Sequence, residues 1–425
     1  MSFLYAPFNS MGGLGVSKLS RHLHEQGWDV RVLCARHDDV PAELPVELPE
    51  ERVVRTGFPD VNALPKLALG RSHIVRRGFE FSKQGLLTRL GRAYWQLTNF
   101  PDGQIGWFPV AFRAGSRLIR DDPPDVILGV GPPWTSHLVA RALGTRFRIP
   151  WVARYHDPWT DSRTRERAWP LGNLERALEN GTARSAAALA AGSDGWRAEL
   201  AARFPSVPVG TVFFGFEPTD YPPAPEPVGL PLRLLYTGRL YERQDAGKLF
   251  EALGSLFATG RVSPDEVRLR LVGRYLELAR RALERIELPD GVVTIEEPVP
   301  RADVPALQQA AGALVLFLGE DDDVGLLPGK MWEYVGARRP ILVIGGSEQH
   351  EAVRILRQAR VGTWAADANA IAETLSGWVA TLRRSEGLRV EPDPVVVRAH
   401  EWSATATDMG DLLREAVRRR RERAA

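Results

Sequence analysis

The sequence predicts an α/β protein made of two domains, each with a parallel sheet. Short apolar runs that suit buried strands alternate with longer amphipathic segments that suit helices, which is the pattern of repeated βαβ units. A chain of 425 residues exceeds what one hydrophobic core usually supports. Residues 220–229 contain four prolines in ten residues, a composition that suits a stiff linker between the two domains.

The N-terminal half begins with a βαβ unit. Residues 3–6 predict a strand, residues 7–15 a glycine-rich turn, residues 16–26 a helix and residues 29–34 a second strand. A glycine loop at a helix N-terminus can bind an anion, so Gly13 is a candidate ligand-binding residue. The full GxGxxG spacing is missing and no acidic residue ends the second strand, so a nicotinamide dinucleotide is not expected.

The rest of this half repeats the alternation and places a titratable pair at a strand end. Strands are predicted at 124–131, 149–155 and 207–214, and helices at 132–143, 175–190 and 196–203. His156 and Asp157 follow the second of these strands directly. Open α/β sheets bind ligands at the carboxyl ends of their strands, so this pair could orient a substrate hydroxyl. Alternatively, Asp157 caps the turn that Pro158 shapes.

The C-terminal half carries cationic candidates at two strand ends. Strands are predicted at 232–236, 267–273, 292–295, 313–318 and 341–344. Gly238 and Arg239 follow the first, and a guanidinium suits a diphosphate. Lys330 and Glu333 share one face of a helix that begins near Pro328. A lysine supplies a point charge for phosphate, and a carboxylate accepts hydrogen bonds from a vicinal diol; an ion pair on a surface helix is the alternative.

These segments resemble the retaining glycosyltransferases of the GT-B fold, in the large family-4 type that uses nucleotide sugars. Residues 327–346 are similar to the PSKxxEYxAxGKPxL segment of that family, and residues 124–161 are similar to its N-terminal half. The resemblance implies two Rossmann-like domains that face a cleft, with a C-terminal helix that returns to the first domain. The implied divisions are an acceptor-binding domain at 1–222, a donor-binding domain at 230–400 and the terminal helix at 401–425.

The resemblance also assigns roles to residues. In the family the lysine faces the donor diphosphate and the glutamate accepts hydrogen bonds from the ribose, which gives these roles to Lys330 and Glu333. The implied catalytic residues are His156, Asp157, Arg239 and Lys330. The implied donor-binding residues are Gly13, Gly238, Arg239, Arg243, Gly325, Leu326, Leu327, Lys330 and Glu333.

Two positions depart from the family pattern. Gln244 or Asp245 stands where a lysine usually follows the arginine, and Arg243 is the plausible substitute. Gly325 stands where a first glutamate is usual. Asp321, Asp322 or Asp323 could replace its hydroxyl contact, or the backbone N–H groups of 325–327 could hold the sugar or phosphate. The adjacent aspartates lack the regular spacing of a calcium loop, so no metal site is expected.

The implied activity is transfer of a hexose-type sugar from a nucleoside-diphosphate sugar to a hydroxyl acceptor, with retention of anomeric configuration. Neither a metal nor another cofactor is expected, and a UDP-sugar is favoured over a GDP-sugar as co-substrate. A non-hydrolysing sugar-nucleotide 2-epimerase shares this architecture and is one alternative. The other alternative is a nucleotide-binding partner subunit without activity, which the glycine at position 325 would suit.

Composition limits the partners and the compartment. A net charge of +2 argues against a general nucleic-acid binder. The single cysteine, Cys34, suits a reducing compartment, and neither a secretion signal nor a membrane-spanning run is recognisable, so we expect a cytoplasmic protein. Residues 66–92 are basic and amphipathic. They could pack as a helical pair with solvated arginines, bind an anionic or lipid-linked acceptor, or attach the protein peripherally to the inner membrane face.

Overall fold

The structure is a computed structural model that describes residues 1–37, 43–62, 96, 98–160, 170–222, 228–319 and 325–424. Two groups of sequence-based expectations, the basic segment 66–92 and the aspartates at 321–323, therefore lie outside the described residues. The chain divides into two compact units, Met1–Val212 with Ala406–Ala425, and Phe213–Thr405. None of the helices in the described ranges has both the length and the apolar character that crossing a lipid bilayer demands.

The first unit contains only parallel strand pairs within its described residues. One sheet pairs β1 (Val32–Ala35) with β2 (Val53–Thr56), and the other has the order β3 (Ile127–Gly131), β4 (Trp151–Tyr155), β5 (Ala188–Ala191) and β6 (Val209–Thr211). The first three residues join these sheets, because Ser2 donates its N–H to Leu33 and forms a parallel bridge with Val130. The predicted strand at 3–6 is thus reduced to this bridge. Its backbone still lies between β1 and β3.

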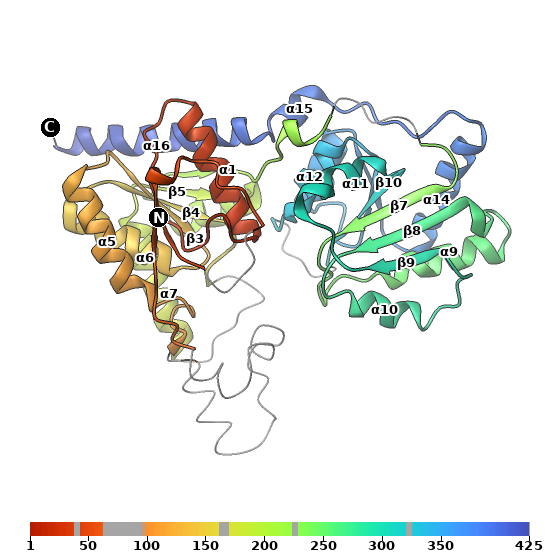
Figure 1. The fold of residues 1–425 in the computed structure, drawn as a ribbon, viewed down its shortest axis with the longest axis horizontal. Helices are drawn as coiled ribbons and strands as arrows, with labels where there is room; N and C mark the ends of the chain where they lie inside the picture. Colours follow the sequence, from red (N-terminus) through yellow and green to blue (C-terminus); the bar gives the residue numbers. More distant parts are fainter. Residues whose placement is uncertain are drawn as a thin grey trace, which may run out of the picture. The chain divides into compact units, whose positions relative to one another are not determined.

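Helices cover the sheets of this unit (Figure 1). Their bounds are α1 Met11–Glu25, α5 Trp107–Asp121, α6 Thr135–Phe147, α7 Leu171–Ser185 and α8 Asp194–Arg203. The prediction of a helix through residue 190 is wrong at its end, because α7 ends at Ser185 and β5 follows. All four residues of β5 are buried. Burial between β4 and β6 therefore overrides the high intrinsic helix propensity of alanine in this run.

The second unit is built around one six-stranded parallel sheet. Its order is β12 (Gly362–Ala365), β11 (Ile341–Ile344), β10 (Ala313–Phe317), β7 (Leu232–Thr237), β8 (Val267–Val272) and β9 (Val293–Glu296). The chain leaves β7 toward β8 and β9, and the later strands add on the other side through β10. The order therefore reverses between β7 and β10. In open α/β sheets, ligands bind at such a switch point, outside the carboxyl ends of the strands.

Two apolar clusters cover the two faces of this sheet, with helices on both sides (Figure 1). One cluster includes α9 (Gly247–Ala258), α10 (Glu277–Leu283) and α14 (Ala368–Arg383). The other includes α12 (Gly329–Ala337), α13 (Glu351–Gln358), α15 (Pro394–Arg398) and one partly buried leucine of α11 (Val304–Ala310). Short 3-10 helices occur at Glu50–Arg52, Pro218–Asp220, Pro264–Glu266 and Arg301–Asp303. A layered, doubly wound unit results.

The terminal helix α16 (Trp402–Ala424) belongs to the first unit from Ala406 onward. Its buried face carries Ala406, Met409, Leu413 and Ala416, which belong to the same apolar cluster as residues of α1, β4 and β5. The spacing of three and four residues places all four on one side of the helix.

The division between the units differs from the expected boundary at 222. Phe216 exchanges backbone hydrogen bonds with the segment near His400, and a side chain on Gly336 of α12 would collide with Phe216 and Tyr221. Both aromatic side chains are buried in the second unit. Residues 213–222 therefore belong with the second unit. Part of the predicted linker, residues 223–227, lies outside the described residues.

Replacing Met409 with alanine tests the packing of α16. Met409 is fully buried, so the variant should lose about 2–5 kcal/mol of unfolding free energy. The exposed Asp411, two residues later, forms an ion pair with Arg414 on the helix surface, so Asp411→Ala should cost less than about 1 kcal/mol. Urea unfolding followed by tryptophan fluorescence compares the two variants. Equal midpoints would show that this face of α16 is not buried.

Candidate functional site

The carboxyl ends of β7 and β8 meet closely at the switch point of the second unit. Gly238, directly after β7, has a φ of +114°, which favours glycine. A Cβ on Gly273, directly after β8, would collide with the carbonyl oxygen of Gly238. A Cβ on Gly238 would lie 3.1 Å from Lys330 Nζ. The absence of a side chain at Gly238 therefore leaves room for a lysine from another element, and the absence of one at Gly273 lets the two strand ends approach closely.

Lys330 lies in the first turn of α12 and reaches back over β7. Its Nζ donates to the hydroxyl of Tyr236 at 2.5 Å and to the carbonyl oxygen of Arg239 at 3.3 Å. The same ammonium lies 3.9 Å from the centroid of the Tyr236 ring. Pro328 is the N-cap of α12, so the helix begins at Gly329 and its first turn places Lys330 at this edge of the sheet. The side chain thus lies against Tyr236 of β7 and the loop that carries Arg239.

The environment of Lys330 disfavours its charge. Desolvation by burial lowers the pKa of Lys330 to about 7, although the negative charge of Glu333 acts in the opposite direction. Near neutral pH this amine is therefore a mixture of charged and neutral forms. An anion bound at the same place would favour the charged form. Binding of a polyphosphate should then draw a proton onto Lys330.

Arg239 is held by two aromatic rings. The carbon of its guanidinium group lies 5.0 Å from the ring centroid of Tyr241 and 4.8 Å from that of Tyr275. A planar guanidinium stacks favourably on such rings and keeps its N–H groups available for hydrogen bonds. Lys330 on α12 contacts the backbone carbonyl of Arg239 on the loop after β7, whereas the guanidinium of Arg239 lies over the two tyrosine rings. Two cationic groups at one edge suit the two phosphates of a diphosphate.

Glu333 faces the same region and is held on both of its carboxylate oxygens. Oε1 accepts from Arg301 Nη2 at 2.6 Å, and Oε2 accepts from Gln308 Nε2 at 3.3 Å. Glu333 is 8% exposed, so it is not the solvated member of a surface ion pair. Arg301 and Gln308 were not among the predicted site residues. Their only sequence signal is that they follow a strand of the same sheet.

The structure shows the surroundings of Gln244 and Gly325, the two positions that depart from the family pattern. The side chain of Gln244 ties its own loop to β10, because it accepts from the N–H of Tyr241 at 3.1 Å and donates to the carbonyl of Phe317 at 2.9 Å. Arg243 is exposed on the same loop. Gly325 is buried, whereas Leu326 and Leu327 are partly buried and lead into α12.

Gly13 occupies the N-terminus of α1 in the first unit. Its N–H already donates to the capping hydroxyl of Ser10 at 3.0 Å, and a Cβ at this position would lie 2.7 Å from the carbonyl oxygen of Phe8. Glycine is therefore required by the tight turn. An anion at this helix end would have to compete with Ser10 for the N–H of Gly13.

His156 and Asp157 lie at the carboxyl end of β4. His156 is 9% exposed, and desolvation, followed by the charges of Arg154 and His137, holds its pKa well below the usual range. It is therefore neutral at physiological pH. Asp157 keeps access to solvent, yet protein packed around its carboxyl group raises its pKa. No residue in the described ranges donates a hydrogen bond to Asp157 from its own turn, so the capping role is not observed.

A small cavity lies beside Asp157. It is lined by Tyr155, Trp159, Glu179 and Trp196 in addition to Asp157. Within the described part of the chain, the hydroxyl of Tyr155 and the indole N–H of Trp196 are buried without hydrogen-bond partners. Buried polar groups are normally satisfied, so a water molecule or a ligand hydroxyl is expected here. The described residues contain no cluster of three or more His, Cys, Asp or Glu side chains that could hold a metal ion.

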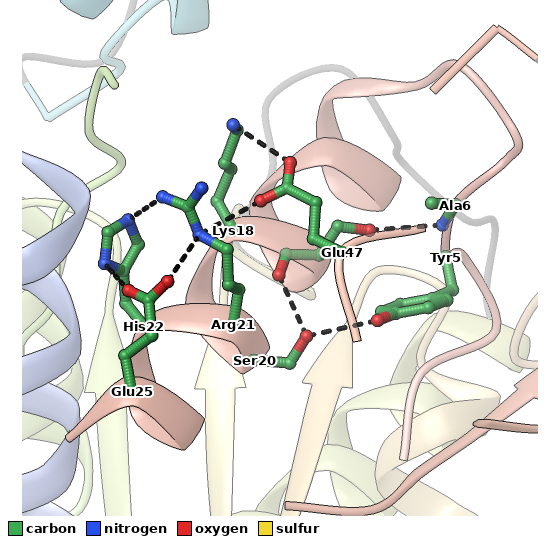
Figure 2. Close-up of polar contacts among 9 residues, drawn as sticks. Tyr5, Ala6, Lys18, Ser20, Arg21, His22, Glu25 and Glu47 are labelled. Atoms are coloured by element: carbon green, nitrogen blue, oxygen red, sulfur yellow. Dashed lines mark hydrogen bonds and ion pairs between the residues drawn. The ribbon is translucent and has the colours of Figure 1, made fainter. Parts of the chain in front are cut away.

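A cluster of ion pairs fixes α1 against the segment that contains Glu47 (Figure 2). Glu47 pairs with Lys18 at 2.9 Å and with Arg21 at 3.1 Å, and His22 Nδ1 lies 3.0 Å from Glu25. Lys18 and Glu47 expose only about a tenth of their side chains, at 11% and 10%. Sequence reasoning missed this cluster because Glu47 is remote from α1 in the chain.

Comparison with known proteins decides the family of the first unit. Residues 12–213 match the model of the glycosyl transferase 4-like domain. No curated protein matches the chain by sequence. The family match agrees with the predicted resemblance to this type of glycosyltransferase over the first unit.

Solved structures extend the likeness to nearly the whole chain. Sucrose-phosphate synthase from Thermosynechococcus elongatus is 18% identical with a TM-score of 0.60, and the match covers 98% of this chain and 95% of that one. HepE of Anabaena in complex with UDP is 12% identical with a TM-score of 0.63, covering 97% and 98%. The α,α-trehalose 6-phosphate synthase from Burkholderia multivorans is 11% identical with a TM-score of 0.58, covering 97% of each chain.

At these identities the likeness concerns the fold, and it confirms the predicted GT-B architecture of two Rossmann-like units with parallel sheets. The family match covers the first unit, whereas Lys330, Arg239 and Glu333 lie in the second. The roles of these three residues therefore rest on the geometry described above. That geometry generates a test that needs no ligand.

Replacing Lys330 with methionine should stabilise the protein in a pH-dependent way. The pKa of Lys330 is about 7 in the folded protein, below its ordinary 10.5, so the charged amine destabilises the folded state. The loss of unfolding free energy that the charged amine causes is greatest below pH 7 and decreases as the pH rises toward 10.5. The gain in unfolding free energy of Lys330→Met over wild type should therefore be largest at pH 6 to 7 and shrink above it. Urea unfolding at several pH values measures it, and a gain that does not vary with pH would contradict the desolvation of Lys330.

Proposed function

We propose that the protein transfers a hexose-type sugar from a nucleoside-diphosphate sugar to a hydroxyl acceptor, with retention of anomeric configuration. The observation that carries the proposal is the contact of the Lys330 ammonium with the loop that carries Arg239, at the switch point of the second unit. Glu333 lies one turn further along the same face of α12, where it suits a ribose. The crystal structures of HepE contain UDP and UDP-glucose, which supports a UDP-sugar as the donor.

The chemistry requires stabilisation of a leaving group. The bond between the anomeric carbon and the diphosphate oxygen breaks, and a bond between that carbon and the acceptor oxygen forms on the same face. The hydroxyl proton of the acceptor passes to the departing diphosphate. Negative charge grows on the diphosphate in the transition state, and Arg239 and Lys330 are the groups that would neutralise it. Arg243 is the candidate for a further phosphate contact, and no metal is required.

The first unit would bind the acceptor. His156 is neutral, so it can accept or donate a hydrogen bond without adding charge. Asp157 and the unsatisfied polar atoms of Tyr155 and Trp196 border one cavity, which suits hydroxyl groups of the acceptor. We propose that His156 and Asp157 orient the acceptor.

A nucleotide-binding subunit without turnover is the second candidate. Two observations favour it: Gly325 replaces the first glutamate of the family pattern, and both ends of the Gln244 amide form hydrogen bonds that hold its loop. Such a protein would bind UDP but would not release it from a UDP-sugar. A sugar-nucleotide 2-epimerase would instead convert the donor to its epimer in the absence of any acceptor.

The first test is the loss of function in Lys330→Ala. With UDP-glucose as the probe donor, the rate of UDP release should fall about 100-fold or more, because the growing diphosphate charge loses a cation. The matched control is Arg384→Ala, which removes one positive charge from the same unit. Arg384 is 57% exposed and pairs with Glu386, so the rate should change less than about twofold. An unchanged rate in Lys330→Ala would remove this lysine from the mechanism.

The second test concerns stereochemistry and metal. The product of an α-linked donor should carry an α-linkage in proton NMR spectra of the first turnover products. Treatment with EDTA should leave the rate unchanged, since Arg239 and Lys330 supply the positive charge that a metal would otherwise supply. A β-linked product would disprove retention. Loss of activity in EDTA that magnesium or manganese restores would disprove metal independence.

A further inference from the structure

We propose that Arg301 and Gln308 are positioning residues that hold the Glu333 carboxylate for the two hydroxyl groups of a ribose, so that they set the preference for ribonucleotides over 2′-deoxyribonucleotides. The inference rests on the proposed function, because it assumes that Glu333 faces the nucleotide. Neither residue belongs to the motifs from which the site was predicted. Both are identified only by their contacts in the folded unit.

Three separate elements meet at the carboxylate of Glu333. Glu333 belongs to α12, Arg301 to the 3-10 helix that follows β9, and Gln308 to α11. Arg301 Nη2 donates to Oε1 at 2.6 Å, and Gln308 Nε2 donates to Oε2 at 3.3 Å. Each carboxylate oxygen therefore has one donor from the protein, and the plane of the carboxylate cannot rotate without breaking one of the two contacts.

The number of remaining acceptor positions matches a vicinal diol. A carboxylate has about four lone-pair positions, two on each oxygen. Arg301 and Gln308 occupy one on each oxygen, which leaves one free position per oxygen. The 2′ and 3′ hydroxyl groups of a ribose supply two O–H donors side by side. The side chain of Glu333 is 10% exposed and that of Arg301 is 28% exposed, so the pair is mostly buried but remains accessible from solvent.

Further hydrogen bonds fix the orientation of the Gln308 amide. Gln308 is fully buried, and its Oε1 accepts from the hydroxyl of Tyr221 at 2.9 Å. Desolvation raises the pKa of Tyr221, so this hydroxyl stays protonated and keeps donating. The Nε2 of Gln308 must then point the other way, where it donates to Thr237 Oγ1 at 3.1 Å as well as to Glu333. An amide held in this way can present only N–H donors to the carboxylate.

The arrangement predicts what the loss of Arg301 would do. Without Arg301, Glu333 Oε1 loses its donor, and the carboxylate can rotate about its bond and hydrate. Its two free lone pairs would then no longer be aligned for two neighbouring hydroxyl groups. Binding through the diphosphate would continue, because Arg239 and Lys330 are unchanged. The loss should therefore fall on the ribose contact and spare the phosphate contact.

The experiment compares the dissociation constants of UDP and 2′-deoxy-UDP by calorimetry for the full chain. Wild type should bind UDP at least about 10-fold more tightly than 2′-deoxy-UDP, since a site built to bond a hydroxyl rejects the analogue that lacks it. In Arg301→Ala this ratio should fall toward one, mainly through weaker binding of UDP. The matched control is Arg270→Ala, because Arg270 pairs with Glu296 on neighbouring strands of the same unit, and its ratio should equal that of wild type.

A conservative variant guards against misfolding. Arg301→Lys keeps the positive charge but not the planar donor group, so its ratio should lie between those of wild type and Arg301→Ala. A ratio in Arg301→Lys and in a folded Arg301→Ala that equals the wild-type ratio would overturn the inference and leave the proposed function intact. Failure of wild type to bind UDP would overturn the proposed function, and the inference with it. Comparable binding of both nucleotides by wild type would overturn the inference alone.

Discussion

The desolvation of Lys330 is the physical constraint on which the rest of the site depends. A lysine would ordinarily be solvated, yet here its ammonium is held over the ring of Tyr236, next to Gly238, which has no side chain to displace it. In the ligand-free protein, the positive charge of Lys330 is therefore unfavourable. An anion with two or more negative charges would relieve this unfavourable state. Under the proposed function, the affinity of the site for a diphosphate would therefore originate partly in the instability of the unoccupied site.

The remaining contacts of the second unit arrange different ligand groups around this lysine. Arg239, stacked between two tyrosines, adds a second cation with a defined plane. Glu333, held by Arg301 and Gln308, adds an acceptor. These groups belong to α12, to the loop after β7 and to the elements that follow β9. They converge because the sheet order reverses between β7 and β10, which brings loops from both halves of the sheet to one edge.

Sequence reasoning succeeded where the signal was local. The predicted strands at 232–236, 313–318 and 341–344 correspond to β7, β10 and β11, because continuous apolar runs bounded by turns suit buried parallel strands. Lys330 and Glu333 could be found because they are one helical turn apart. Sequence reasoning failed where tertiary packing determines the secondary structure or the contacts of a residue. The alanine run at 188–191 became a strand through burial, and Arg301 and Gln308 lie 32 and 25 residues from Glu333, with no pattern to connect them.

The most direct test of the account is the number of protons taken up when UDP binds. Calorimetry at pH 8 in buffers of different ionisation enthalpy measures this number. A free Lys330 with a pKa of about 7 is mostly neutral at pH 8, so binding should take up close to about one proton in wild type and none in Lys330→Met. UDP that binds to wild type without proton uptake would contradict the claim that a desolvated Lys330 is charged by the diphosphate.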